Sequence, residues 1–289
     1  MNNKSMAYDE AYFMAKYYQA DFEEDAIMNG YYINWNYLVE QNFTREDQVL
    51  ELTLSYLKEL FLLSEYALDN GITLTDNEKK AIASEVDSFM SNSHSKLISS
   101  ANANEELMSR IYTRRALYNK ICDQILIDKD LSIDPEDARI CTIKVATITA
   151  EKFDSPERVA NEIANRVNNG DVLGEVAGYY GLSIEKSYIG KDSEGKKEAI
   201  DFCLSLKSDE CKVLELDGNY LVIYCVLEND EVETANNKEN LLTEKKQSYI
   251  TAFIDELLKE NPITINTTAW ETINFDTRIY VKDDIIKSE

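Results

Sequence analysis

Few side chains in this 289-residue sequence could carry out chemistry. It has one histidine, His94, which lies in the Ser/Asn-rich stretch 91–104. A single histidine excludes multi-histidine metal centres and argues against a histidine-based catalytic triad. The cysteines form no CxxC pair and lie at Cys122, Cys141, Cys203, Cys211 and Cys225. We interpret His94 as a solvated loop residue and the cysteines as buried free thiols, because nothing nearby supplies a thiolate-stabilising base.

Carboxylates are abundant, but their spacing suits no catalytic or metal site. The run Glu23-Glu24-Asp25 occupies adjacent helical positions, which do not converge on one point. The clusters at 228–231 and 283–284 lack the DxDxDG spacing of a calcium loop and are interpreted as solvated loops. We therefore expect no metal.

The overall composition excludes further classes of function. The net charge of −24 argues against nucleic-acid binding, which requires a basic surface. Neither GxGxxG nor GxxxxGK[ST] occurs, so no nucleotide cofactor is expected. With only 3 prolines and 9 glycines, the chain should form long uninterrupted elements, mostly helices.

Patterning predicts helices at both ends of the chain and an α+β segment between them. Helical spacing and capping signals predict helices over 7–29, 44–70, 75–90, 104–128 and 237–260, with a last short helix at 268–270. An irregular aromatic stretch at 31–43 and the polar link 91–104 separate the first four. The middle segment predicts the order β-α-α-β-α-β-β, over 139–149, 156–169, 171–180, 182–189, 195–207, 213–215 and 220–227. Residues 263–265 are a further strand candidate.

The late helix needs a packing partner. Leu242, Tyr249, Phe253 and Leu257 line one face of it, and the N-terminal helices have spare apolar faces. We expect these faces to pack together. This gives an α+β fold in which a discontinuous all-α domain, residues 1–133 with 236–289, contains an inserted α+β domain, residues 134–235.

This order of elements, together with four local motifs, resembles the exported foldases of the PrsA and SurA type. The motifs are NGITLTDNE at 70–78, DPEDAR at 134–139, EVAGYY at 175–180, and LSLKSDE at 204–210 followed by DGNYLVI at 217–223. The resemblance spans nearly the whole chain. It implies a SurA N-terminal-like helical chaperone domain with an inserted parvulin-type (PpiC-type) prolyl isomerase domain.

The inserted segment departs from the pattern of active parvulins. The two histidines of that family would fall at about Ile140 and Tyr220, and its glycine-rich loop is reduced to the residues around Gly190. Further positions of the degenerate pocket fall at Ala199 and Leu206. We assign no catalytic residue and expect the parvulin-like domain to be inactive. The alternative is an active peptidyl-prolyl cis-trans isomerase with an atypical pocket.

The 18 tyrosines offer a second kind of site, with Tyr17, Tyr31, Tyr32, Trp35 and Tyr37 as the candidate binding residues. Tyrosine combines a large apolar contact area with a polar tip and few rotamers, which suits promiscuous peptide binding. The simpler interpretation is the edge of an amphipathic core. The resemblance implies unfolded polypeptide clients, held without ATP, metal or other cofactor. A third hypothesis is an interaction protein whose inserted domain mediates homodimerisation.

The sequence leaves the compartment open between two interpretations. Residues 1–5 lack an apolar signal region, and no apolar run approaches a membrane span. The resemblance implies an extracytoplasmic protein, a lipoprotein whose signal peptide and lipid anchor lie outside this chain. A cytoplasmic location is the alternative, which the five thiols taken alone would favour.

Overall fold

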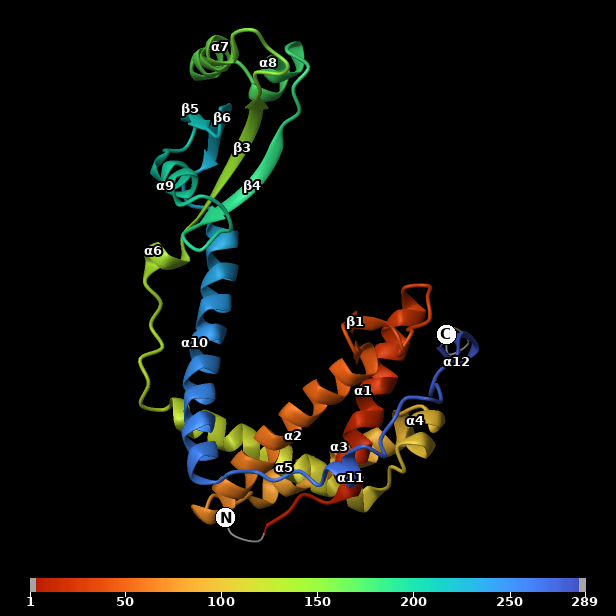
Figure 1. Ribbon diagram of the computed structural model, residues 1–289. Helices are drawn as coiled ribbons and strands as arrows, with labels where there is room; N and C mark the ends of the chain where they lie inside the picture. Colours follow the sequence, from red (N-terminus) through yellow and green to blue (C-terminus); the bar gives the residue numbers. More distant parts are fainter. Residues whose placement is uncertain (1–3, 286–289) are drawn as a thin grey trace. The chain divides into compact units, whose positions relative to one another are not determined.

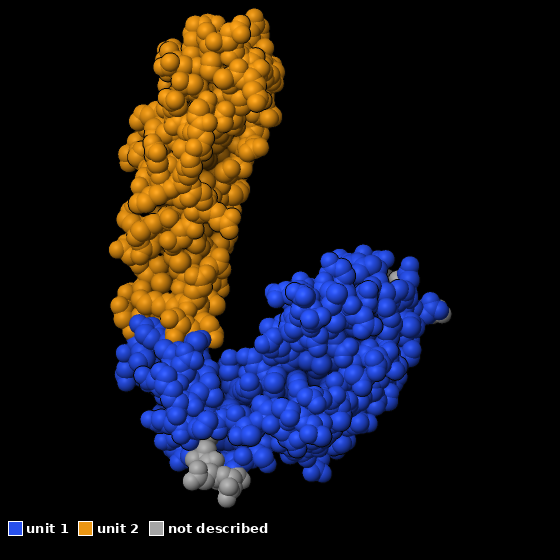
Figure 2. Space-filling model, viewed as in Figure 1, with its two compact units in different colours: residues 1–129, 249–289 blue, residues 130–248 orange. Residues whose placement is uncertain are grey.

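The computed structural model describes residues 4–285 and divides into two compact units (Figure 2). The helical unit comprises residues 1–129 and 249–289, and the inserted unit comprises residues 130–248. Helices and one small antiparallel sheet of four strands make the fold α+β, as the sequence predicts.

The domain limits inferred from the sequence, at 133/134 and 235/236, stay a prediction. The second of them falls inside a single continuous helix, α10 (Glu231–Glu260).

The first part of the helical unit contains five helices: α1 (Tyr8–Met28), α2 (Arg45–Asp69), α3 (Asp76–Asn92), α4 (Ser95–Ser100) and α5 (Glu105–Leu126). Capping explains where three of them start. The Thr44 hydroxyl accepts the Asp47 N–H, and the Asp47 carboxylate accepts the Thr44 N–H. Thr75 and Glu78 repeat this reciprocal arrangement at α3, and Asn104 caps α5.

Four local elements differ from the sequence prediction. The polar link contains α4, because Leu97 is buried and the His94 side chain accepts the Lys96 N–H at the start of the helix. The aromatic stretch contains a two-strand ladder, β1 (Leu38–Glu40) with β2 (Phe43–Thr44). A short helix, α12 (Lys282–Ile285), was not predicted. Residues 263–265 belong to no helix and pair with no strand among residues 4–285.

The two ends of the chain share cores, as the unpaired apolar faces predict. Ile250, Ile254 and Leu257 of α10 pack with Leu62, Leu63 and Ala67 of α2 and with Leu117 and Ile121 of α5. A second cluster joins Trp35 to Ile273 and Phe275. The last described helices, α11 (Thr267–Trp270) and α12, therefore belong to the same unit as α1 (Figure 1).

The inserted unit is built around the predicted β-α-α-β-α-β-β order. After the short helix α6 (Pro135–Ala138) it comprises β3 (Ile140–Ile148), α7 (Pro156–Asn168), α8 (Leu173–Tyr179), β4 (Glu185–Gly190), α9 (Lys197–Ser205), β5 (Cys211–Leu216) and β6 (Asn219–Leu227). The antiparallel sheet has the order β4-β3-β6-β5 (Figure 1). Asp217 and Gly218, between β5 and β6, both have positive φ, at 53° and 76°, which is the conformation of a two-residue hairpin turn.

Alternation along β3 explains why helices cover both faces of the sheet. Cys141 and Ile143 enter the core that contains Cys203 of α9, whereas Ala146 and Ile148 enter the core beneath α7 and α8. Successive strand residues point to opposite faces, so a strand that is buried at both sets of positions needs cover on each side.

Candidate functional site

Four of the five predicted aromatic binding residues are exposed. The exposed fractions are 38% for Tyr17, 52% for Tyr31, 49% for Tyr32 and 56% for Tyr37. They do not form one cluster on a single element. Tyr17 lies in the middle of α1, and eleven residues, or roughly 16 Å of helix rise, separate it from the helix end that precedes Tyr31.

Trp35, the fifth predicted residue, is a core side chain that is only 5% exposed. Its ring packs edge-on against Phe275 at 4.7 Å between centroids. Its indole N–H donates to the Glu23 carboxylate at 3.0 Å. As placed, Trp35 holds the C-terminal segment of the helical unit and offers little surface to a client.

Two of the exposed tyrosines are held in place by cations. The Arg278 guanidinium lies 4.7 Å from the Tyr32 ring centroid, and the Tyr32 hydroxyl accepts the Lys282 N–H. Arg45 lies 5.6 Å from the ring of Tyr37. Such contacts restrict the rings, so that less side-chain entropy would be lost if a ligand bound to them.

A second group of tyrosines was not singled out as a site from the sequence. Tyr18 of α1 and Tyr56 of α2 meet edge-on at 6.4 Å. Burial raises the pKa of both, and of Tyr112 on α5, so the three hydroxyls stay neutral at physiological pH. The charge of Arg115 acts on all three, and within residues 4–285 no side-chain hydrogen bond, ion pair or cation–π contact of its guanidinium is found. The sequence could have revealed this group of tyrosines only through the helical positions that direct them from α1, α2 and α5 towards one another.

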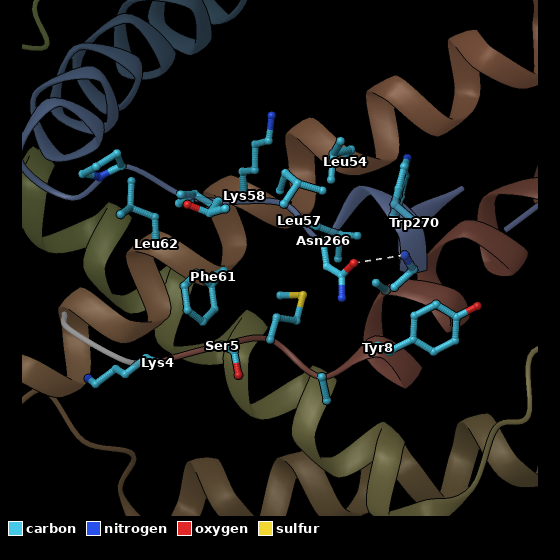
Figure 3. A pocket seen from close by; sticks show the side chains of 18 of the residues that line it. Lys4, Ser5, Tyr8, Leu54, Leu57, Lys58, Phe61, Leu62, Asn266 and Trp270 are labelled. Atoms are coloured by element: carbon cyan, nitrogen blue, oxygen red, sulfur yellow. Dashed lines mark hydrogen bonds between the residues drawn. The ribbon is translucent and has the colours of Figure 1, made fainter. Parts of the chain in front are cut away.

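The helical unit also contains an open groove of about 690 Å³. Three segments that are distant in the sequence line it: residues 4–11, residues 54–62 of α2, and residues 260–270. Leu57 and Phe61 project from α2, while Ser5 and Asn266 lie on the other two segments (Figure 3). The apolar stripe of α2 is predictable from the spacing of its leucines, but no local pattern indicates that residues 4–11 and 260–270 would border it.

The lining of the groove is mainly apolar with a few polar groups. Met6, Leu54, Phe61, Ile263, Ile265 and Trp270 all line it and are only partly buried. At the edge, Lys4 forms ion pairs with Glu65 at 3.1 Å and Asp69 at 2.5 Å. An apolar trough with a polar rim is the usual form of a site for peptides or small molecules.

In the inserted unit, the predicted pocket positions do not converge. Ile140 pairs with Gly190 at one end of β3, and Tyr220 pairs with Ile148 at the other, roughly 26 Å away along the strand. Ala199 and Leu206 both belong to the core on the α9 face. Leu206 is only 1% exposed, so it is part of that core and not of an open pocket.

The cavity found in the inserted unit, about 520 Å³, has a different character. It is lined largely by charged and polar side chains, including Glu136, Arg139, Lys207, Glu228 and Lys238. Arg139 is occupied there as a structural donor, because its guanidinium donates to the carbonyls of Leu204 and Glu228. A lining of this polarity does not form the apolar pocket that a proline ring requires.

Comparison with known proteins finds likeness in structure only. No family model matches the sequence, and no curated protein matches it.

Among residues 4–285, none of the helices combines the length and apolarity that crossing a membrane requires.

Three solved structures illustrate the likeness. The peptidylprolyl isomerase PrsA of Bacillus cereus is 18% identical, with 88% of this chain and 98% of that chain covered and a TM-score of 0.38. PrsA of Bacillus subtilis is 13% identical, with coverage of 84% and 100% and a TM-score of 0.26. The foldase protein PrsA of Streptococcus pneumoniae is 14% identical, with coverage of 82% and 97% and a TM-score of 0.29. The chain is similar to these PrsA structures, as the sequence motifs predict.

Proposed function

We propose that this protein is a chaperone of the PrsA-like foldase kind, which holds unfolded polypeptide on its helical unit without ATP. The observation that carries the proposal is the amount of large apolar surface that the N-terminal segment exposes. Eight such side chains lie within residues 8–38: Tyr8, Tyr17, Phe22, Met28, Tyr31, Tyr32, Tyr37 and Leu38. Exposed apolar side chains concentrated in this way are typical of interaction sites.

The groove supports the same conclusion independently. Its lining is mostly aliphatic and aromatic, and it is open rather than enclosed. Apolar surface of this kind binds side chains that folded proteins bury, which an unfolded client still exposes. The net charge of −24 would keep a complex with an aggregation-prone client soluble.

We further propose that the inserted unit is catalytically inactive. Its sequence contains no histidine, because His94 lies in the helical unit. Its cysteines are buried thiols whose pKa burial raises, to about 11 for Cys203 and about 12 for Cys211. They are therefore protonated near neutral pH and poor nucleophiles.

An extracytoplasmic location, with a lipid anchor outside this chain, is part of the proposal. The five thiols do not oppose it, because all five are buried and none lies on an accessible surface. Buried, protonated thiols react slowly with oxidants, so the protein could persist in an oxidising compartment.

A client assay tests the proposal directly. The protein is added without ATP to an unfolding client, such as heated citrate synthase, and light scattering follows aggregation. Suppression at near-stoichiometric ratios is the expected result. Aggregation that proceeds at the same rate with and without the protein would refute the proposal. Static light scattering of the protein alone separates the third hypothesis, a homodimerising interaction protein.

A further inference from the structure

One wall of the groove is residues 262–265, which belong to no helix and pair with no strand among residues 4–285. Ile263 and Ile265 are partly buried, whereas Pro262 and Thr264 are exposed, which is the alternation of a β-strand. Within residues 4–285, no hydrogen bond involves the backbone N–H or C=O of Ile263, Thr264 or Ile265. The sequence predicts a strand here, and within residues 4–285 the segment has the burial alternation of a strand but no strand partner.

A second extended segment borders the groove at another side. Ala7 has φ −73° and ψ 146°, and the backbone groups of Ser5 and Met6 also form no hydrogen bond with the described residues. Figure 3 shows Ser5 on this segment and Asn266 on the other, with Phe61 projecting from α2. The groove is thus flanked by main-chain donors and acceptors on two sides.

The base of the groove suits the side chains of an added strand. Leu57 and Phe61 lie one helical turn apart on α2, and Trp270 closes one end. In an extended peptide every second side chain points the same way, about 7 Å apart, so alternate apolar side chains could enter the groove. The residues between them would remain in water.

We propose that residues 263–265 accept an extended segment of unfolded polypeptide as an added β-strand. Its alternate apolar side chains lie in the groove over Leu57 and Phe61. This inference rests on the proposed function and names the form in which a client binds. Main-chain pairing gives affinity that depends little on sequence, which suits a protein with many clients.

Two other occupants fit the groove less well. A helical segment satisfies its own backbone groups, so it would leave the exposed edge of 263–265 unused. A second copy of this chain carries the same charge of −24, which opposes association. An extended, neutral or basic segment meets neither objection.

Proline substitution tests the main-chain pairing, because proline lacks the N–H but tolerates an extended backbone. Adjacent residues of an extended chain direct their N–H groups to opposite edges, so the test uses two positions. Thr264→Pro is compared with Thr264→Ala, and Ile265→Pro with Ile265→Ala. The probe is a fluorescein-labelled peptide of alternating threonine and valine with one central phenylalanine, and anisotropy measures binding.

One proline variant should bind the probe about two- to tenfold more weakly than its alanine partner, since one hydrogen bond is lost. The other proline variant should match its partner. A second measurement leaves the protein unchanged: the same peptide, N-methylated at alternate positions, should also bind more weakly. Thermal unfolding of all four variants shows whether they are folded.

Three results would overturn the inference. The first is that each proline variant binds the probe as tightly as its alanine partner, and that the N-methylated peptide binds as tightly as the unmethylated one. This result would indicate a helical or irregular occupant. The second is no binding of the probe by a protein that suppresses client aggregation. The third is weakening of both proline variants without any effect of N-methylation. If the unaltered protein does not suppress client aggregation at all, the proposed function itself is refuted.

Discussion

The carboxylate of Glu23 accepts the backbone N–H of Ile279 at 2.7 Å, across 256 positions of sequence. The same oxygen accepts the Tyr280 N–H, and the other accepts the side-chain N–H groups of Gln19 and Trp35. Glu23 is 1% exposed, so this one side chain satisfies four donors in the core of the helical unit. It joins α1 to the segment that follows α11.

We predict that Glu23→Gln destabilises the helical unit by about 2–3 kcal/mol, because the amide directs an NH₂ group at buried donors and leaves them unsatisfied. Urea unfolding followed by tryptophan fluorescence would measure the loss, since Trp35 reports on this site. Glu24→Gln, at an exposed neighbouring position, is the matched control. Equal stability of the two variants would contradict the structural role of the Glu23 carboxylate.

A second prediction concerns pH. The Thr75 N–H and the Lys120 ammonium lower the pKa of Glu78 from its ordinary 4.5 to about 2 in the folded state. A depressed folded pKa contributes stability above pH 4.5 that disappears as the pH falls towards 2. The difference in melting temperature between the unaltered protein and Glu78→Gln should therefore be largest at neutral pH and close near pH 2. Glu85→Gln, elsewhere on α3, should show no such convergence.

A third prediction concerns the exposed aromatic side chains. Replacing Tyr17, Tyr31 and Tyr37 together by alanine should weaken aggregation suppression several-fold, because each ring supplies apolar contact area. Tyr179→Ala is the matched control, since Tyr179 is 81% exposed but belongs to the inserted unit. If alanine at all three positions left suppression unchanged, the role of these rings in client binding would be refuted.

A fourth prediction concerns catalysis. In a prolyl-peptide isomerisation assay the protein should give no turnover above the uncatalysed rate, because the inserted unit has no histidine and a polar cavity. Turnover that is abolished by Tyr220→Ala or Cys203→Ala would contradict this prediction and establish an active isomerase with an atypical pocket.

A fifth prediction concerns the thiols. Burial raises the pKa of Cys122, Cys141 and Cys225 to about 11, and it also raises the pKa of Cys203 and Cys211. A thiol-reactive disulfide reagent at pH 8 should label the native protein slowly and all five thiols rapidly in denaturant. Rapid labelling of even one thiol in the native protein would show a cysteine that is more accessible than the structure indicates.

Elements with strong local signals could be predicted from the sequence. The caps at Thr44 and Thr75 fall where the sequence predicts two helices to begin, because each cap depends on neighbouring residues only. The helix α4 was missed since its main signal is one buried leucine, Leu97, in a polar stretch. The strand alternation of 263–265 is present, but whether a strand finds a partner depends on distant residues.

The candidate sites were less predictable. Tyrosine content indicated a binding surface, but it could not show that Trp35 is buried, which depends on the acceptor that Glu23 provides. The groove has no local signature, because segments more than two hundred residues apart in the sequence line it. The family resemblance places two pocket positions at Ile140 and Tyr220, whereas strand register puts them at opposite ends of β3.

The shared cores of the helical unit set an order for its folding during synthesis or export. Trp35 lacks Phe275, and Glu23 lacks Ile279, until residues 273–281 have emerged. The inserted unit, by contrast, has all its strands once β6 is complete. A nascent chain would therefore carry a folded inserted unit beside an unfinished helical unit, and the proposed client-binding surface would be complete only after residues 273–281 had been synthesised.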